Sequence, residues 1–202
     1  MMLTAFQDFL YSCALSFDLP ILDWIQANLQ SGFMDKFMPF ITIFGDAGIF
    51  WMVWAGVLLL FRKTRKTGLG MFFAMILGLL VCNITLKPLV ARIRPYDLQA
   101  EMGVTIQLLC GLQHDFSFPS GHTIASFEAA VVLLKNGKKM GIPAMILAVL
   151  ISFSRLYLYV HYPTDVLASI ILGTLFALIG DAIAAKVAPK LHFGKKGKFE
   201  AA

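Results

Sequence analysis

Long apolar stretches dominate this 202-residue chain and leave few folds open to it. Hydrophobic residues make up 58% of the chain and charged residues 14%, which is too apolar for a soluble domain of this size. A helix needs roughly 20 residues to cross a bilayer, and five stretches approach that length: residues 44–61, 68–86, 120–134, 141–159 and 164–187. The sequence therefore predicts an all-α integral membrane protein, a bundle of about five transmembrane helices.

The N-terminal segment, residues 1–43, is harder to interpret than the rest of the chain. Its first stretch is apolar but carries Asp8 and Asp18, and Pro20 interrupts the pattern. Apolar residues between 22 and 29 recur at helical spacing among polar ones, as in helices that lie in the membrane interface. An additional spanning helix is the alternative, and it would move the N-terminus to the cytoplasm. We expect N-terminal interfacial helices.

Lysine and arginine are unevenly distributed and orient the predicted bundle. They cluster in residues 62–66, 135–139 and 186–198, which share one side if all five stretches span. By the positive-inside rule, this side is cytoplasmic. The net charge of +5 is then a topology signal with lipid-headgroup contact, and no nucleic-acid partner is expected. We expect three parts: the interfacial segment 1–43, a transmembrane bundle over 44–189 and a basic cytoplasmic tail over 190–202.

Three cations crowd the end of the second spanning stretch, on the side that otherwise avoids cations. Lys87, Arg92 and Arg94 lie within eight residues, and Pro95 follows. Like charges this close repel one another unless an anion neutralises them. Guanidinium groups suit bidentate phosphate binding, and lysine supplies a point charge. Taken alone, Lys87 is typical of a membrane anchor at a helix end. The cluster predicts phosphate binding, with Arg92 as a secondary contact at most.

The run Pro119-Ser120-Gly121-His122 opens the third spanning stretch. Ser120 is a suitable N-cap, and Gly121 lets a ligand approach the backbone closely. A helix N-terminus is a ready anion site because its N–H groups are free. The alternative is a plain cap followed by a core histidine. Beside a cationic site, His122 is the candidate general acid, since its unperturbed pKa is about 6.5.

A third group of candidate residues joins the fourth and fifth spanning stretches. Arg155 lies in the last turns of one helix, and Pro163 fits the first turn of the next. His161 and Asp165 are four residues apart, so Asp165 can accept a hydrogen bond from one imidazole nitrogen and direct the other outward. A structural His–Asp pair is the alternative. A buried Arg155 needs an anionic partner, which favours a functional site.

Five other residues of these helices remain outside this chemistry. Tyr157, Tyr159 and Tyr162 are expected to form an aromatic belt at the membrane interface. Glu128 does not share the face of His122, and we expect it to form an interhelical hydrogen bond. Asp181 is expected to approach the cytoplasmic interface.

Taken together, the three motifs resemble the type 2 phosphatidic acid phosphatase superfamily. The pattern is Lys-x6-Arg-Pro, Pro-Ser-Gly-His and Ser-Arg-x5-His-x3-Asp, and residues 87–165 match it at every position. The resemblance implies a phosphatase that works through a phosphohistidine, without metal or other cofactor. It implies His161 as nucleophile, Asp165 as its orienting group and His122 as proton donor. The phosphate-binding residues that it implies are Lys87, Arg94, Arg155, Ser120 and Gly121.

The expected substrate is a lipid phosphate or diphosphate, because the site lies at the bilayer surface among apolar helices. On the site side, Asp97 and Asp115 stand apart in the sequence, which also favours a reaction without metal. An outward-facing site and a short chain resemble the bacterial members that act on undecaprenyl diphosphate. Phosphatidylglycerophosphate and phosphatidate phosphatases share the same motif residues. A phosphotransferase or a transporter could carry such cations too, but a transporter would favour repeated halves, which are not found.

Overall fold

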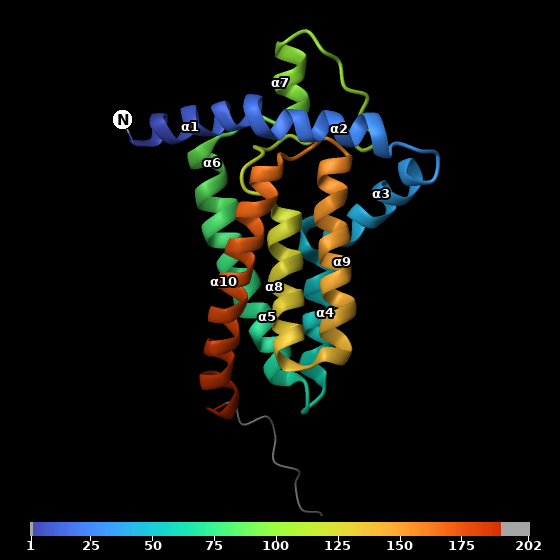
Figure 1. The fold of residues 1–202 in the computed structure, drawn as a ribbon. Coiled ribbons are helices and arrows are strands. Elements are labelled where there is room, and N and C mark those ends of the chain that lie inside the picture. Colours follow the sequence, from blue (N-terminus) through green and yellow to red (C-terminus); the bar gives the residue numbers. More distant parts are fainter. Residues whose placement is uncertain (1, 191–202) are drawn as a thin grey trace, which may run out of the picture.

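The computed structural model describes residues 2–190, and it contains helices and no strand over that range (Figure 1). The segments labelled η are 3₁₀- or π-helical. In chain order the elements are α1 (Met2–Cys13), η1 (Ala14–Asp18), α2 (Leu19–Leu29), α3 (Met34–Thr42), η2 (Ile43–Gly48), α4 (Ile49–Leu60), α5 (Arg65–Gly78), η3 (Leu79–Leu86), α6 (Lys87–Val90), α7 (Pro95–Glu101), α8 (Gly121–Asn136), α9 (Lys138–Tyr157), α10 (Pro163–Val187) and η4 (Ala188–Lys190).

The long helices form a bundle whose outer surface suits lipid. Leu60 and Ile171 are 73% and 69% exposed, and other large apolar side chains share this outer surface. The α8 helix has 16 residues, about 24 Å at 1.5 Å per residue, and packs against α5, α9 and α10. Four helical stretches are long and apolar enough to cross a membrane: Met34–Leu60, Arg65–Glu101, Lys138–Tyr157 and Pro163–Lys190. The all-α, multi-pass membrane fold is confirmed.

A rod made of α1, η1 and α2 lies across one end of the bundle instead of running through it (Figure 1). Leu22 and Ile25 are buried, whereas Trp24 between them is 58% exposed. The location of these N-terminal helices in the membrane interface stays a prediction. The boundary expected after residue 43 falls at the start of η2, where the chain bends between α3 and α4. The predicted basic tail, residues 190–202, lies outside the described residues except for Lys190.

Small residues allow the helices of the bundle to approach closely. A Cβ atom at Gly180 of α10 would lie 2.6 Å from the backbone nitrogen of Ala74 in α5. One at Gly173 would lie 2.9 Å from the carbonyl oxygen of Ile124 in α8. Such positions are typical of membrane helix interfaces, where close backbone packing replaces the hydrophobic effect. They hold α10, which carries Asp165, against α5 and α8.

The end of the bundle away from the rod is basic. Asp181 of α10 lies 3.4 Å from Nζ of Lys66 and 3.0 Å from Nζ of Lys135, and Asn136 donates a hydrogen bond to it. The connections α4–α5 and α8–α9 meet at this end (Figure 1). The predictions that two basic clusters share one side, and that Asp181 approaches that side, are confirmed.

Candidate active site

His161 lies at the opposite end of the bundle, in the short connection between α9 and α10. The turn that places it includes Tyr159 at φ 60°, a strained conformation for a residue other than glycine. Its imidazole is buried; Nδ1 lies 3.5 Å from Oδ2 of Asp165, and Nε2 lies 3.4 Å from Nη1 of Arg94. Nδ1 has no hydrogen-bond partner in this state. The predicted His161–Asp165 pair is therefore present, at a separation longer than a hydrogen bond.

The surroundings of His161 favour its neutral form. Burial, reinforced by the positive charges of Arg94 and Arg155, holds the pKa of this imidazole well below its usual value. A neutral imidazole keeps a free lone pair, which a nucleophile requires. Because Nδ1 faces Asp165, the nitrogen available for attack is Nε2, beside Arg94.

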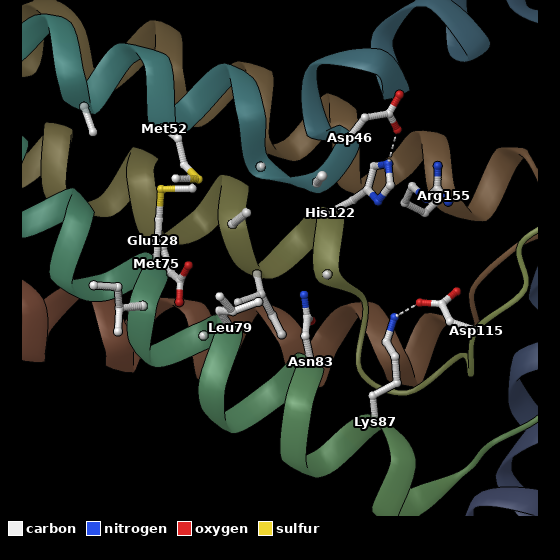
Figure 2. Close-up of a pocket in the computed structure, with 18 of the residues that line it drawn as sticks. Asp46, Met52, Met75, Leu79, Asn83, Lys87, Asp115, His122, Glu128 and Arg155 are labelled. Carbon is white, nitrogen blue, oxygen red and sulfur yellow. Dashed lines mark hydrogen bonds and ion pairs between the residues drawn. The ribbon is translucent and has the colours of Figure 1, made fainter.

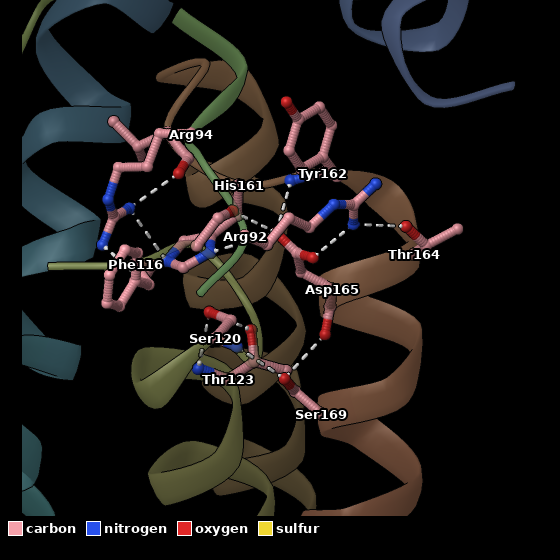
Figure 3. A network of polar contacts seen from close by, with 12 residues as sticks. Arg92, Arg94, Phe116, Ser120, Thr123, His161, Tyr162, Thr164, Asp165 and Ser169 are labelled. Carbon is pink, nitrogen blue, oxygen red and sulfur yellow. Dashed lines mark hydrogen bonds and ion pairs between the residues drawn. The ribbon is translucent and has the colours of Figure 1, made fainter. Parts of the chain in front are cut away.

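Asp165 is the centre of a closed network of hydrogen bonds (Figure 3). Its Oδ1 accepts a hydrogen bond from Nη1 of Arg92 at 2.5 Å. Its Oδ2 accepts one from the backbone N–H of Tyr162 at 3.0 Å and another from the Ser117 hydroxyl. The carboxylate is thus fixed at the first turn of α10, as the sequence predicts for a group that orients His161.

Arg92 belongs to this network and not to the phosphate site. Nη2 of Arg92 donates to Oδ2 of Asp18 at 2.8 Å, and its guanidinium lies 3.8 Å above the ring centre of Tyr162. Asp18 also accepts hydrogen bonds from the backbone N–H and the hydroxyl of Thr164. The expectation that Arg92 is a secondary phosphate contact is wrong, because Asp18 and Asp165 occupy its N–H donors. No local feature of the sequence indicates this role of Asp18.

The expected aromatic belt is also wrong. The side chains of Tyr157, Tyr159 and Tyr162 are buried instead of lying at the membrane surface. The hydroxyl of Tyr157 donates to Asp35 at 2.5 Å, and that of Tyr159 donates to Asp23 at 2.6 Å. Asp23 and Asp35 belong to α2 and α3, so these hydrogen bonds attach the N-terminal helices to the connection that carries His161.

The three predicted phosphate-binding cations meet beside His161. Nη1 of Arg155 donates to Oγ1 of Thr42 at 2.5 Å, but Nε and Nη2 are buried without a hydrogen-bond partner. Lys87 forms an ion pair with Asp115, and Nη2 of Arg94 lies 2.5 Å from the other oxygen of the same carboxylate. A guanidinium with two unpartnered nitrogens in a buried site indicates space for an anion.

Asp115 is a site residue that sequence reasoning missed. It lies in the connection between α7 and α8, and its side chain is 53% exposed. Burial opposes ionisation, but hydrogen bonds and charge from Lys87 and Arg94 lower the pKa of this carboxyl group to about 2. Asp115 thus provides the negative charge that a phosphate would bring to the same two cations. Its separation from Lys87 by 28 residues hides the contact from a local reading.

The start of α8 presents Gly121 and His122 to the site. The prediction that Ser120 is the N-cap is confirmed: its hydroxyl accepts from the backbone N–H and the hydroxyl of Thr123. Ser120 is buried, and its own backbone N–H donates to Ser169. Its contribution to phosphate binding stays a prediction, since the adjoining cavity is lined by the next two residues.

His122 has a carboxylate partner that the sequence did not indicate. Its Nε2 lies 2.8 Å from Oδ1 of Asp46, which is 76 residues away in the chain. The chain bends sharply there, with Ala47 at φ 49° and Gly48 at φ 67°. Gly45 makes room, because a Cβ atom at that position would lie 2.6 Å from Cδ2 of His122. The available signal in the sequence was Asp46 itself, an acidic residue in the otherwise uncharged apolar stretch 44–61.

These groups line one end of a cavity of about 560 Å³ (Figure 2). From the cations and histidines the cavity follows α4 as far as Leu59, a length of about 16 Å along the helix axis from Gly48. Most of this length is apolar, with side chains of α4 facing those of α5. The cavity joins an anion site to an apolar groove, as binding a lipid headgroup together with its chain requires. Its apolar part is lined by Met52, Ala55, Gly56, Leu59, Phe72, Met75, Ile76 and Leu79.

Fold and site together define a helical membrane protein that handles the phosphate group of a lipid. Residues 67–187 match the PAP2 superfamily, and the chain belongs to that family. It is 32% identical over 161 residues to an undecaprenyl-diphosphatase of Sulfolobus acidocaldarius, covering 79% of this chain and 75% of the relative. It is 28% identical over 175 residues to a lipid A 4'-phosphatase of Bacteroides thetaiotaomicron, covering 82% and 76%.

A solved structure supports the same assignment. The transmembrane PAP2-type phosphatidylglycerolphosphate phosphatase of Bacillus subtilis superposes with a TM-score of 0.70 at 27% identity, covering 92% of this chain and 96% of that one. This protein is accordingly a membrane PAP2 lipid phosphatase. Its relatives are named for different lipid phosphates, so family membership leaves its own substrate open.

Proposed function

We propose that the protein hydrolyses a lipid phosphate or diphosphate through a phosphohistidine at His161, at the extracytoplasmic face of the cell membrane. The observation that carries this proposal is the Arg155 guanidinium, whose nitrogens Nε and Nη2 are buried without a hydrogen-bond partner beside a neutral imidazole. An anion that binds Arg155, Arg94 and Lys87 has its phosphorus close to Nε2 of His161. Phosphoryl transfer depends mainly on such positioning and charge stabilisation.

The reaction has two steps. In the first, Nε2 of His161 attacks phosphorus, the bond to the leaving oxygen breaks, and protonated His122 donates its proton to that oxygen. In the second, neutral His122 accepts a proton from water, the water oxygen attacks phosphorus, and the phosphorus–nitrogen bond breaks to release inorganic phosphate. Asp165 stabilises the positive imidazole of His161, and Asp46 that of His122.

The cations of the site take the role that a metal ion has in other phosphoryl-transfer enzymes. Within residues 2–190, no group of three His, Cys, Asp or Glu side chains is placed to hold a metal ion. The carboxylates near the site, Asp46 and Asp115, are each engaged by basic side chains. These contacts support a reaction that needs no metal.

Undecaprenyl diphosphate is the substrate that we favour. The apolar length of the cavity suits a prenyl chain, and the relative from Sulfolobus is named for this lipid. Phosphatidylglycerophosphate and phosphatidate are the alternative substrates. A lipid phosphotransferase would use the same site, with a hydroxyl group in place of water in the second step.

The release of inorganic phosphate, measured in detergent with EDTA present, tests this proposal. The lipids compared are undecaprenyl diphosphate, phosphatidylglycerophosphate and phosphatidate. We expect release by the wild type and a loss of at least about 10⁴-fold in His161→Ala, because removing a nucleophile costs most of the catalysis. His114→Ala is the matched control, because it removes an exposed histidine that has no role in the proposed mechanism. Trapping of an acid-labile phosphoenzyme from ³²P-labelled lipid tests the intermediate. Release that survives in His161→Ala, or that EDTA abolishes and one divalent ion restores, contradicts the mechanism.

The orientation of the site needs a separate test. The basic end of the bundle supports a cytoplasmic location for the α4–α5 and α8–α9 connections, and thus an outward-facing site. A His114→Cys variant that lacks the three native cysteines places a thiol in the connection beside Asp115. We expect an impermeant maleimide to label this thiol in intact cells; labelling only after lysis contradicts the orientation.

A further inference from the structure

Two polar side chains in the apolar part of the cavity have no role in the proposed chemistry. Glu128 of α8 is 1% exposed, yet it lines the cavity, and its Oε1 has no hydrogen-bond partner. Asn83 of η3 lines the same cavity, between Lys87 and Glu128 (Figure 2). Neither residue belongs to the motifs that bind phosphate. A purely apolar lining would serve a hydrocarbon chain better than these two groups do.

The position of Glu128 is set by the packing of α8 against α5. Its carboxyl group contacts the backbone of Gly78, where a Cβ atom would collide with Oε1. The prediction was an interhelical hydrogen bond; the carboxyl group lies against the backbone of α5, and its Oε1 has no hydrogen-bond partner. A buried polar atom without a partner is unfavourable, and more so within a membrane. Its persistence on a cavity wall indicates a partner that arrives with the ligand.

Asn83 and Glu128 lie at successive depths below the phosphate site. Asn83 is four residues before Lys87, and its Oδ1 lies 3.3 Å from the position that a Cβ atom of Gly121 would take. Glu128 is six residues after His122, which is about 9 Å along α8. Both depths lie where a lipid passes from its phosphate to its hydrocarbon chains.

The chemistry of that region differs between lipid classes. A polyprenyl diphosphate has only hydrocarbon below its diphosphate, whereas an acylglycerol phosphate has ester carbonyls there. An amide donates through its N–H groups, and a neutral carboxyl group donates through its O–H. Both can therefore bind ester carbonyl oxygens, and neither gains a partner from a prenyl chain.

We propose that Asn83 and Glu128 form a recognition subsite for the ester linkages of acylglycerol phosphates. The subsite lets the same catalytic residues act on this class of lipid besides polyprenyl diphosphates. This inference rests on the proposed function, since it assumes that the phosphate binds at Arg155 and reacts at His161. Asn83 and Glu128 are then specificity residues, with no part in the phosphoryl transfer itself.

The experiment compares three lipids with the full-length enzyme in detergent: dioleoyl phosphatidate, its di-O-alkyl analogue without carbonyl groups, and undecaprenyl diphosphate. The measured quantity is kcat/KM for each lipid. The ester-to-ether ratio is kcat/KM for dioleoyl phosphatidate divided by kcat/KM for its di-O-alkyl analogue. Glu128→Leu removes the hydrogen-bonding group at similar size, and Glu128→Gln is the matched variant that keeps a donor. Asn83→Leu is an independent variant that leaves Glu128 in place, in case Glu128→Leu fails to fold.

We expect Glu128→Leu and Asn83→Leu each to lower the ester-to-ether ratio by up to about tenfold, the value of one hydrogen bond. Glu128→Gln keeps most of the wild-type ratio. A merely structural role lowers kcat/KM for all three lipids together and leaves the ratio within twofold, which overturns the inference. A wild type that cleaves undecaprenyl diphosphate but not phosphatidate also overturns it and leaves the proposed function standing. No release from any of the three lipids refutes the proposed function, and the inference falls with it.

Discussion

Two groups of buried charges meet at His161, and they differ in how far they are satisfied. In the first group, Arg92 lies between Asp18 and Asp165, and each carboxylate oxygen accepts at least one hydrogen bond. In the second, two nitrogens of Arg155 have no hydrogen-bond partner, and Arg94 is neutralised by the half-exposed Asp115. Buried charges that satisfy one another hold a structure together, whereas buried charges left unsatisfied indicate a ligand.

The difference also separates the residues by role. We call the first group, Asp18, Arg92 and Asp165, the closed group, and the second group, with Arg155 and Arg94, the open group. The closed group holds Asp165 in place and does not line the cavity, so its effect on catalysis passes through His161. The open group lines the cavity, and in the proposed mechanism it binds the phosphate of the substrate. Substitutions in the open group should therefore change catalysis in a folded protein, and those in the closed group should change stability first.

Among the cations of the open group, the largest effect on catalysis is expected at Arg155. Arg155→Ala removes a donor from the oxygens that gain charge in the transition state, and we expect kcat/KM to fall about 10²- to 10³-fold with little change in thermal unfolding. Arg155→Lys keeps the charge but loses the planar pair of donors, so it should recover only part of the activity. Phosphate release and unfolding temperature in detergent are measured together. A large drop in unfolding temperature would place Arg155 in the structural group.

Arg92 should behave in the opposite way. Arg92→Ala leaves the carboxylates of Asp18 and Asp165 buried without their counterion, and breaking such a pair costs about 3 to 5 kcal/mol of folding free energy. We expect a strongly lowered unfolding temperature in detergent. Lys36→Ala, which removes an exposed cation at the same end, should leave the unfolding temperature unchanged. Normal stability in Arg92→Ala would remove the basis of the comparison.

The charge of the open group should also shift the pH profile. Because the pKa of His161 lies well below that of an ordinary histidine, its neutral form persists to acid pH, and we expect kcat/KM to stay constant through the pH range in which an ordinary imidazole becomes protonated. Arg94→Gln removes a cation that opposes protonation of His161, so the fall of kcat/KM at acid pH should begin at a higher pH than in the wild type. His114→Ala is the control. A fall that begins at the same pH with Arg94→Gln would contradict this assignment of the fall to His161.

The smallest effect is expected at Asp115, which competes with phosphate for Lys87 and Arg94. A half-exposed ion pair contributes about 0.2 to 1 kcal/mol, so Asp115→Asn should tighten inhibition by inorganic phosphate about two- to fivefold. The inhibition constant is measured with the lipid substrate at fixed concentration. Weaker inhibition would show that Asp115 assists binding instead of competing with it.

The spanning helices and the motif residues could be predicted from the sequence because their signals are local. Apolar length indicates a membrane helix, and His161 and Asp165 are only four residues apart in the chain. The carboxylates that complete the site could not be found in this way. Asp18 meets Arg92 across 74 residues and Asp46 meets His122 across 76, so each contact depends on how whole helices pack.

The three tyrosines show the same limit. Their spacing near a helix end is typical of residues at the membrane surface, and on its own it predicts a surface location. The N-terminal helices cover that end of the bundle and supply Asp23 and Asp35 as partners. Once covered, the same side chains become part of the core. A pattern within one segment cannot indicate which other segment will cover it.

The closed group also has a consequence for the order in which the protein assembles during its synthesis. Asp18 lies in η1, Arg92 in the connection between α6 and α7, and Asp165 in α10, and Asp18 accepts a hydrogen bond from Thr164 across 146 residues. A nascent chain that has not yet reached α10 has no Asp165 to share Arg92 with Asp18. We therefore expect His161 and the network that fixes Asp165 to be assembled together, late in membrane insertion. Translation arrested before residue 161 would leave a chain with most of its helices and no phosphatase activity.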